Sequence, residues 1–222
     1  MLPSFIVDFF FPLNCLGCDV EKTLLCESCL NTIPLSPIQR CPGCSIPSQN
    51  GVCCPRCALN WSLDGLYVMS VYSKESLLQT AIQFMKYKNG QSLCTRFGEW
   101  LSGSDLKFSK FMISPVPLHT SREKTRGYNQ SFLIAHSLSR YTNAPLQKLL
   151  TRARSTPPQA QLSRKNRLTN LANAFEVTTM PSSSPILLID DVCSTGATLN
   201  ECARVLKENG ASNVWGLVLA RG

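Results

Sequence analysis

The stretch that decides the fold is Pro185–Gly210, with the sequence PILLIDDVCSTGATLNECARVLKENG. Residues 186–189 form a continuous apolar run rich in branched side chains, which predicts a strand buried on both faces of a parallel sheet. We expect this strand to end at Asp190 and Asp191. A polar loop then leads into a helix with apolar residues at helical spacing, and Asn209-Gly210 is a typical helix stop.

The loop after the acid pair has small side chains and three hydroxyl groups: Cys193, Ser194, Thr195, Gly196, Ala197 and Thr198. Gly196 can take a positive φ, so the backbone can close tightly around a ligand. A helix that starts after such a loop points unpaired N–H groups and the positive end of its dipole into it, which favours phosphate. Two carboxylates beside a phosphate need another partner, either vicinal sugar hydroxyls or Mg²⁺. Together these groups predict a site for a ribose 5-phosphate.

Other phosphate-binding patterns fit less well. The loop has no Gly-Lys-Ser/Thr sequence, and the Rossmann fingerprint is absent. Residues 186–198 resemble the signature of type I phosphoribosyltransferases for binding 5-phosphoribosyl 1-diphosphate (PRPP), in which an apolar strand precedes two acids and a Thr-Gly-x-Thr loop. The alternative is an ordinary strand-to-helix turn capped by Thr198, which leaves Asp190 and Asp191 unexplained.

Composition and length indicate a globular protein. The chain has 222 residues, 44% of them hydrophobic, enough for one moderate domain and a small one. The apolar stretch 2–13 is too short to span a bilayer and contains Pro3, Asp8 and Pro12. We therefore expect no membrane span and no signal peptide, a short helix around Phe5 and Phe9, and a cytoplasmic protein whose cysteines are not disulfide-bonded.

Four Cys-x-x-Cys pairs lie within the first sixty residues, and they predict two structural Zn²⁺ sites without an open coordination position. Pairing by neighbours gives one set of Cys15, Cys18, Cys26 and Cys29 and a second of Cys41, Cys44, Cys54 and Cys57. Interleaved pairing is the alternative, and an iron–sulfur cluster or buried free cysteines fit the paired spacing less well. Cys53 and Cys54 are alternative candidates for one ligand position, and we choose Cys54 because it has the x-x spacing to Cys57.

The region after the cysteines reads as alternating strands and helices. We expect strands at 66–72, 111–116 and 213–220, and helices at 77–85, around 97–101 and around 132–138. The domain boundary is predicted near residue 60, which separates a zinc-ribbon region at 1–60 from an α/β domain at 61–222.

A basic stretch, HTSREKTRGYNQ at 119–130, follows the strand expected at 111–116. It belongs to a longer run, 107–175, with twelve Lys or Arg and one acid, Glu123. Most of the net charge of the chain, +8, therefore comes from residues 107–175. Such a surface suits the phosphates of a substrate or a nucleic-acid backbone, and the sequence does not separate these two uses.

Taken together, the motifs resemble those of the ComF/GntX family of phosphoribosyltransferase-like proteins over essentially the whole chain. The motifs are the cysteine pairs, Val116-Pro117-Leu118-His119, Arg126-Gly127-Tyr128-Asn129-Gln130, Thr156-x-x-Gln159 with Arg167 and Asn173-Ala174-Phe175, and the Asp190-Asp191 loop. The resemblance implies a mainly parallel type I phosphoribosyltransferase-like sheet flanked by helices and preceded by a double zinc ribbon.

The resemblance also implies roles for single residues. Residues 115–119, with Pro117, would form the diphosphate-binding loop, and 126–130 the mobile loop that closes over PRPP. Residues 194–198 would bind the 5-phosphate. The cations expected at the diphosphate are Arg122, Lys124 and Arg126.

Two hypotheses about function follow. The first is Mg²⁺-dependent PRPP binding with phosphoribosyl transfer, in which Asp190 and Asp191 hold the ribose while Mg²⁺ and the cations of 122–126 stabilise the leaving diphosphate. No general base is identified, and the acceptor is either a nucleobase of a salvage reaction or absent. The second is a non-catalytic factor of DNA uptake that binds PRPP or single-stranded DNA and works with a competence helicase.

Overall fold

The protein is described by a computed structural model that places residues 13–87, 90–154, 173–181 and 183–222. The helix expected around Phe5 and Phe9 lies outside these ranges, and so do the motif residues Thr156, Gln159 and Arg167. Within the described part of the chain, no helix is both long enough and apolar enough to cross a bilayer.

A four-stranded sheet forms the centre of the molecule, and all of its strand pairs are parallel. Its order is β1 (Gly65–Val71), β6 (Val214–Arg221), β5 (Ile186–Cys193) and β2 (Met112–Pro115). Side chains of β5 alternate between two hydrophobic clusters, with Leu187 on one face and Leu188 on the other. The prediction of a parallel strand buried on both faces is confirmed.

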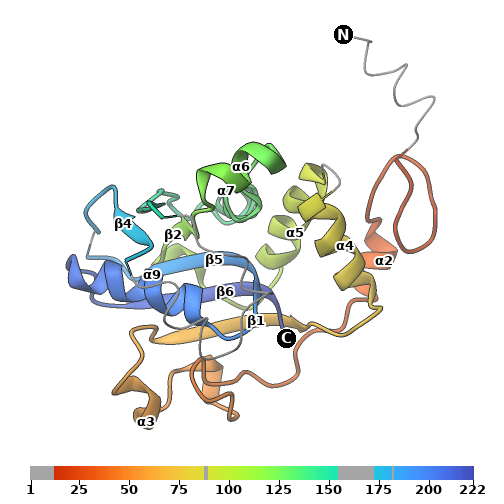
Figure 1. Cartoon of the computed structure of the whole chain (residues 1–222). Helices are drawn as coiled ribbons and strands as arrows, with labels where there is room; N and C mark the ends of the chain where they lie inside the picture. Colours follow the sequence, from red (N-terminus) through yellow and green to blue (C-terminus); the bar gives the residue numbers. More distant parts are fainter. Residues whose placement is uncertain (1–12, 88–89, 155–172, 182) are drawn as a thin grey trace.

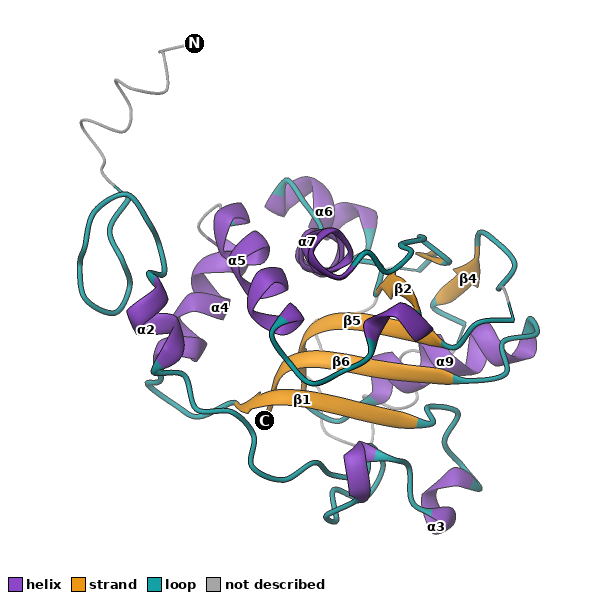
Figure 2. Cartoon of the chain, turned by 180° about the vertical axis from the view of Figure 1, so that it is seen from behind, coloured by secondary structure: helices purple, strands orange, loops and turns teal. Residues whose placement is uncertain are grey.

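Helices cover both faces of this sheet (Figures 1 and 2). The hydrophobic cluster on one face includes α4 (Leu77–Tyr87), α5 (Gln91–Ser102) and α7 (Gln130–Thr142), and the cluster on the other face includes α9 (Ala197–Glu208). The remaining elements are α2 (Glu27–Asn31), η1 (Gln49–Gly51), α3 (Pro55–Ala58), η2 (Phe108–Lys110), α6 (Thr120–Arg126) and the antiparallel pair β3 (Leu150–Arg152) and β4 (Phe175–Val177). The parallel sheet with helices on both sides confirms the predicted fold class.

Three expectations about local structure need correction. Strand β5 does not end at the acids but continues to Cys193, because residues 190–193 pair with 218–221 of β6. Helix α9 starts at Ala197 with Gly196 (φ 78°) as its N-cap, so the loop is shorter than expected, and the alternative of a turn capped by Thr198 does not hold either. The basic stretch contains a helix, α6, whose N-terminus is capped by the His119 side chain.

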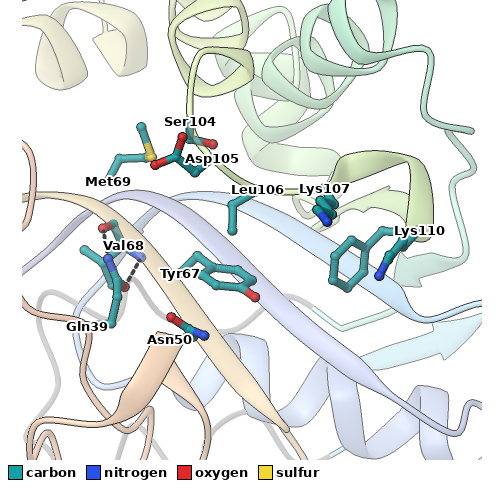
Figure 3. A pocket seen from close by; sticks show the side chains of 11 residues that line it. Gln39, Asn50, Tyr67, Val68, Met69, Ser104, Asp105, Leu106, Lys107 and Lys110 are labelled. Carbon is teal, nitrogen blue, oxygen red and sulfur yellow. Dashed lines mark hydrogen bonds between the residues drawn. The ribbon is translucent and has the colours of Figure 1, made fainter.

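The cysteine region wraps around the β1 edge of the sheet. Leu24, Leu25 and Leu30 belong to the hydrophobic cluster that contains α4 and α5, whereas Leu63 belongs to the cluster that contains α9. The segment between them lies along β1, where the Gln39 side chain donates to Val68 O and accepts from Val68 N, both at 2.9 Å (Figure 3). These bonds occupy backbone groups of an edge strand that would otherwise be open to pairing. The boundary near residue 60 remains a prediction.

Candidate functional site

The candidate site is a cavity of about 870 Å³ at the carboxyl ends of β2 and β5. Ligands of open parallel sheets bind at this edge, because the loops that follow the strands converge there. The cavity is lined by the acid pair, by Val116, Pro117 and Leu118 after β2, and by Ser194 and Thr198 after β5. Residues from three separate sequence motifs therefore share one cavity.

The two acids have different environments. Asp191 is buried and accepts a hydrogen bond from Gln130 Nε2 at 3.0 Å, and its Oδ1 lies 3.0 Å from Lys86 Nζ. Asp190 Oδ1 accepts from Ser131 Oγ at 3.0 Å and from the backbone N–H of Asp191 at 2.9 Å. Within the described residues no hydrogen bond is found to Asp190 Oδ2.

Burial and the neighbouring charge of Asp191 raise the pKa of Asp190 to about 7, although Lys86 and the hydrogen bonds oppose this shift. Burial opposes protonation of Lys86, but the charge of Asp191, its hydrogen bond and the charge of Asp190 together outweigh burial and raise the pKa of Lys86 as well. The site therefore pairs a charged lysine with one carboxylate and leaves the second to titrate near neutral pH.

The Arg-Gly-Tyr-Asn-Gln motif connects α6 to α7 and supports the site. Gly127 ends α6 in the left-handed region (φ 84°), and the buried Tyr128 hydroxyl donates to Met85 O. Asn129 Oδ1 caps α7 by accepting from Ser131 N at 3.0 Å, while its Nδ2 donates to Val116 O at 3.1 Å. The motif therefore holds the start of α7 against the end of β2.

The role that the family resemblance implied for residues 126–130, a mobile loop closing over PRPP, stays a prediction. Tyr128 and Gln130 are buried, and Arg126 donates to Gln130 Oε1. Each of these side chains is engaged by its surroundings, so the segment is an ordered support for the acid pair in this structure.

Helix α6 places the three predicted cations differently relative to the cavity. Arg122 and Arg126 are four residues apart, lie on one helix face and line the cavity, whereas Lys124 is exposed and is not among its lining residues. Burial, followed by the charge of Arg126, lowers the pKa of Arg122. Lys74, Lys86 and Arg152 also line the cavity, so the described part of its lining has five cations against two acids. This balance suits a ligand with several negative charges.

The phosphate loop, which we define as residues 194–198, lies at the start of α9. Gly196, Ala197 and Thr198 border a small hollow next to Asp190, and the N-cap residue, Gly196, has no side chain that could cap the helix. Thr195 Oγ1 accepts from Ala197 N at 3.4 Å, which fixes the turn. The start of a twelve-residue helix therefore borders the same hollow as Asp190, and phosphate binding by its first amides stays a prediction.

The residues of the cavity lining that sequence reasoning did not single out as ligands or partners of the acids include Lys74, Lys86, Gln130, Ser131 and Arg152. Lys86 ends an amphipathic helix and shows no motif. Arg152, on β3, is buried with its guanidinium 5.3 Å from the Phe175 ring centroid, and the sequence showed it only as part of the basic run. Gln130 is the last residue of the Arg-Gly-Tyr-Asn-Gln motif and Ser131 follows it, so the motif was the sequence signal that could have identified them.

The eight predicted cysteines form two separate clusters, paired by neighbours. In each set, Cys15/Cys18/Cys26/Cys29 and Cys41/Cys44/Cys54/Cys57, the Sγ atoms lie within 4.8 Å of one another. Backbone N–H groups donate to the cluster sulfurs, as Cys26 N does to Cys15 Sγ at 3.4 Å. Four converging thiols fit a tetrahedral Zn²⁺, and Cys53 is outside the second cluster.

One thiol in each cluster is poised to ionise. Burial opposes the ionisation of Cys15 and Cys41, but several backbone N–H groups outweigh it and lower the pKa of each to about 6. By contrast, burial raises the pKa of Cys53 to about 12. The pKa values of Cys29 and Cys57 inside the clusters are raised as well, so these shifts do not distinguish metal ligands from Cys53. Cys53 is assigned to packing because it lies outside the second cluster.

A second cavity of about 530 Å³ lies beside β1 and the start of β2 (Figure 3). Tyr67, Leu106 and Phe111 line it, together with Lys107 and Lys110. It contains neither the phosphate loop nor the acid pair, so it is separate from the candidate site.

Comparison with known proteins identifies the class first. A model of the phosphoribosyl transferase domain family matches residues 129–221, which include α7, the acid pair and the phosphate loop. Among solved structures, the allosteric regulatory enzyme of purine biosynthesis is similar, with a TM-score of 0.44 and 17% identity over 62% of this chain and 30% of that chain. The observed sheet and the match to the family model define a protein with a type I phosphoribosyltransferase-like domain.

Curated relatives extend over most of the chain. Competence protein F of Haemophilus influenzae is 32% identical over 95% of this chain and 99% of its own length. Competence protein ComFC of Bacillus subtilis is 29% identical over 89% of this chain and 84% of its own length. DNA utilization protein YhgH of Escherichia coli O157:H7 is 30% identical over 78% of this chain and 80% of its own length. The chain belongs to the ComF family.

Proposed function

We propose that the cavity binds PRPP together with Mg²⁺ and that this binding serves DNA uptake. The observation that carries the proposal is the convergence of the phosphate loop, the acid pair and five cations on one cavity. Amides at the start of α9 suit the 5-phosphate, and Asp190 suits the ribose hydroxyls or a Mg²⁺ ion, which binds oxygen ligands and would neutralise part of the diphosphate charge. Arg122, Arg126 and Arg152 suit the diphosphate.

The proposal is tested by calorimetric titration of PRPP with Mg²⁺ and, separately, with EDTA. Replacing both Asp190 and Asp191 by Asn should abolish binding while the zinc content stays the same. Unchanged affinity in that variant would remove the basis for the site assignment.

A matched pair of variants on α6 tests the orientation of the cations. Arg126→Met should weaken PRPP binding by about tenfold or more, because it removes a charge-assisted contact to the ligand. Lys124→Met, on the exposed face, should bind within about twofold of the wild type. Equal losses in the two variants would contradict a ligand bound in this cavity and favour a diffuse charge effect.

Phosphoribosyl transfer is the catalytic form of this proposal. In such a reaction C1 of the ribose gains oxocarbenium character as diphosphate leaves, so the cations around the diphosphate would stabilise the developing charge. Incubation of labelled PRPP with each nucleobase decides the point. A ribonucleotide product identifies the acceptor, whereas saturable binding without product in every reaction supports a binding protein.

Single-stranded DNA is the second candidate ligand, and the names of the relatives favour it: competence proteins in two bacteria and a DNA utilization protein in a third. The basic excess of this chain, +8, provides a physical reason. Binding of an oligonucleotide should weaken steeply with salt, and saturating PRPP should leave it unchanged if the DNA lies outside the cavity. Competition by PRPP would instead make the cavity itself the DNA site.

A further inference from the structure

We propose that the second cysteine cluster, Cys41/Cys44/Cys54/Cys57, positions the phosphate loop, so that metal bound there determines how well the loop is formed. The loop is the segment 194–198 defined above. The effect on ligand affinity rests on the proposed function, whereas the effect on the loop itself does not. Three sets of contacts carry the inference.

Arg221, at the end of β6, joins the cluster to the strand that leads into the loop. Its guanidinium donates to Cys41 O at 3.1 Å, to Pro42 O at 2.9 Å and to Ser45 Oγ at 2.9 Å. In the sheet, Arg221 pairs with Cys193, the residue before the loop. Gly222 N also donates to Cys193 O at 3.2 Å. A displaced cluster would therefore release three hydrogen bonds at the base of the loop.

Trp61 lies between the cluster and the loop. A Cβ atom built on Gly196 would be 3.0 Å from two atoms of the Trp61 ring and 3.5 Å from Pro42 O. One built on Gly43 would lie 3.1 Å from Trp61 Nε1. Both glycines therefore approach the indole closely, and the cluster, the ring and the loop form one packed unit.

Asn200 provides the third contact. It lies in the first turns of α9, and its Oδ1 accepts from Ser62 N at 2.8 Å and from Leu63 N at 3.2 Å. Its own N–H donates to Gly196 O at 2.9 Å. The start of α9 is thereby tied to the segment that directly follows the second cluster.

The first cluster makes contacts of a different kind. A Cβ atom on Gly17 would lie 3.1 Å from Leu77 Cδ2, at the start of α4, and the neighbouring Leu24 and Leu25 belong to the hydrophobic cluster on the opposite sheet face. The two metal sites therefore provide a matched comparison. Loss of the first should affect α4, whereas loss of the second should affect the phosphate loop.

Hydrogen exchange without ligand tests this difference directly. Cys44→Ser and Cys18→Ser replace the exposed second cysteine of the first knuckle in each cluster. We expect amides 194–198 to exchange about tenfold faster in Cys44→Ser than in Cys18→Ser, since local protection follows the stability of the supporting contacts. Equal protection of the loop in the two variants would overturn the inference, even if PRPP does not bind.

Arg221→Met tests the same coupling with the metal site intact and is the alternative if Cys44→Ser fails to fold. Its control is Arg204→Met, which removes an arginine paired with Glu201 and Glu208 on the outer side of α9. Loop amides should lose protection in Arg221→Met and keep it in Arg204→Met, with two zinc ions per chain in both. Equal protection in both variants would contradict the role of Arg221.

Coupling between the metal and the ligand is reciprocal. In Cys18→Ser, which would hold only the second ion, saturating PRPP should raise the zinc affinity in competition with a chelator by about tenfold. In Cys44→Ser, which would hold only the first ion, PRPP should leave the zinc affinity unchanged. If PRPP binds but changes the zinc affinity equally in the two variants, the coupling is refuted. If the wild type does not bind PRPP, the proposed function is refuted, and the hydrogen-exchange experiment alone tests the link between the second cluster and the loop.

Discussion

Lys86 Nζ lies 3.0 Å from Asp191 Oδ1, so the end of α4 reaches across the site to one member of the acid pair. Two adjacent carboxylates that are shielded from water repel each other, and a lysine that neutralises one of them makes the pair compatible with folding. Gln130 satisfies the other oxygen of Asp191 at 3.0 Å. The two acids therefore have different contacts: Asp191 is held by Lys86 and Gln130, whereas Asp190 accepts from Ser131 through Oδ1 and lines the cavity.

Lys86→Met should destabilise the protein by about 3 kcal/mol, because it leaves the charge of Asp191 buried without its cation. Urea unfolding measures the change. The control is Arg96→Met, since Arg96 pairs with Glu99 at the surface and its loss should cost less than about 1 kcal/mol. Adding Asp191→Asn to Lys86→Met should restore part of the stability, and a double variant less stable than Lys86→Met would contradict the argument.

Stability should fall as the pH rises, because the pKa of Asp190 is raised from 3.8 to about 7 in the folded protein. The folded state then favours the protonated acid, so the contribution of this group is greatest below about pH 4 and is lost by about pH 7. Between pH 5 and pH 8 the wild type should lose about 3 kcal/mol more than Asp190→Asn. Urea midpoints at both pH values measure this difference.

The control for the pH experiment is Asp105→Asn, which removes an exposed acid far from the pair in sequence. It should keep the pH dependence of the wild type. If Asp190→Asn keeps it as well, the proton is not bound at Asp190.

Two glycines with a similar backbone conformation should respond differently to alanine. A Cβ atom added at Gly127 (φ 84°) would have no neighbour within 4 Å among the residues that the structure describes, whereas one added at Gly196 (φ 78°) would meet the Trp61 ring at 3.0 Å. Gly127→Ala should cost about 1 kcal/mol of backbone strain, and Gly196→Ala about 1 kcal/mol more. In a Trp61→Leu background the two costs should converge, and thermal unfolding that shows the same gap would argue against the contact.

Zinc content should distinguish two adjacent cysteines. Native mass spectrometry should find two zinc ions in the wild type and in Cys53→Ser, but only one in Cys54→Ser, because Cys54 belongs to the second cluster and Cys53 does not. One ion in Cys53→Ser with two in Cys54→Ser would reverse the assignment.

Much of the fold and part of the site were predictable. Strand β5, helix α9 and the cysteine pairs are defined by residues that lie next to one another in the chain, so periodicity and spacing identify them. Helix α6 was missed because its residues are polar or charged all round and carry no apolar stripe. Without that helix, the sequence could not separate Lys124 from Arg122 and Arg126.

The sequence by itself determined the types of chemistry present: two acids before a phosphate loop, a basic segment and two sets of four thiols. Only the tertiary structure decided which side chains meet. Lys86 reaches Asp191, and Arg221 holds the second cysteine cluster against the loop, because strand order and helix packing bring together segments that are distant in sequence. Such contacts depend on the packing of the whole chain, and no local pattern encodes them.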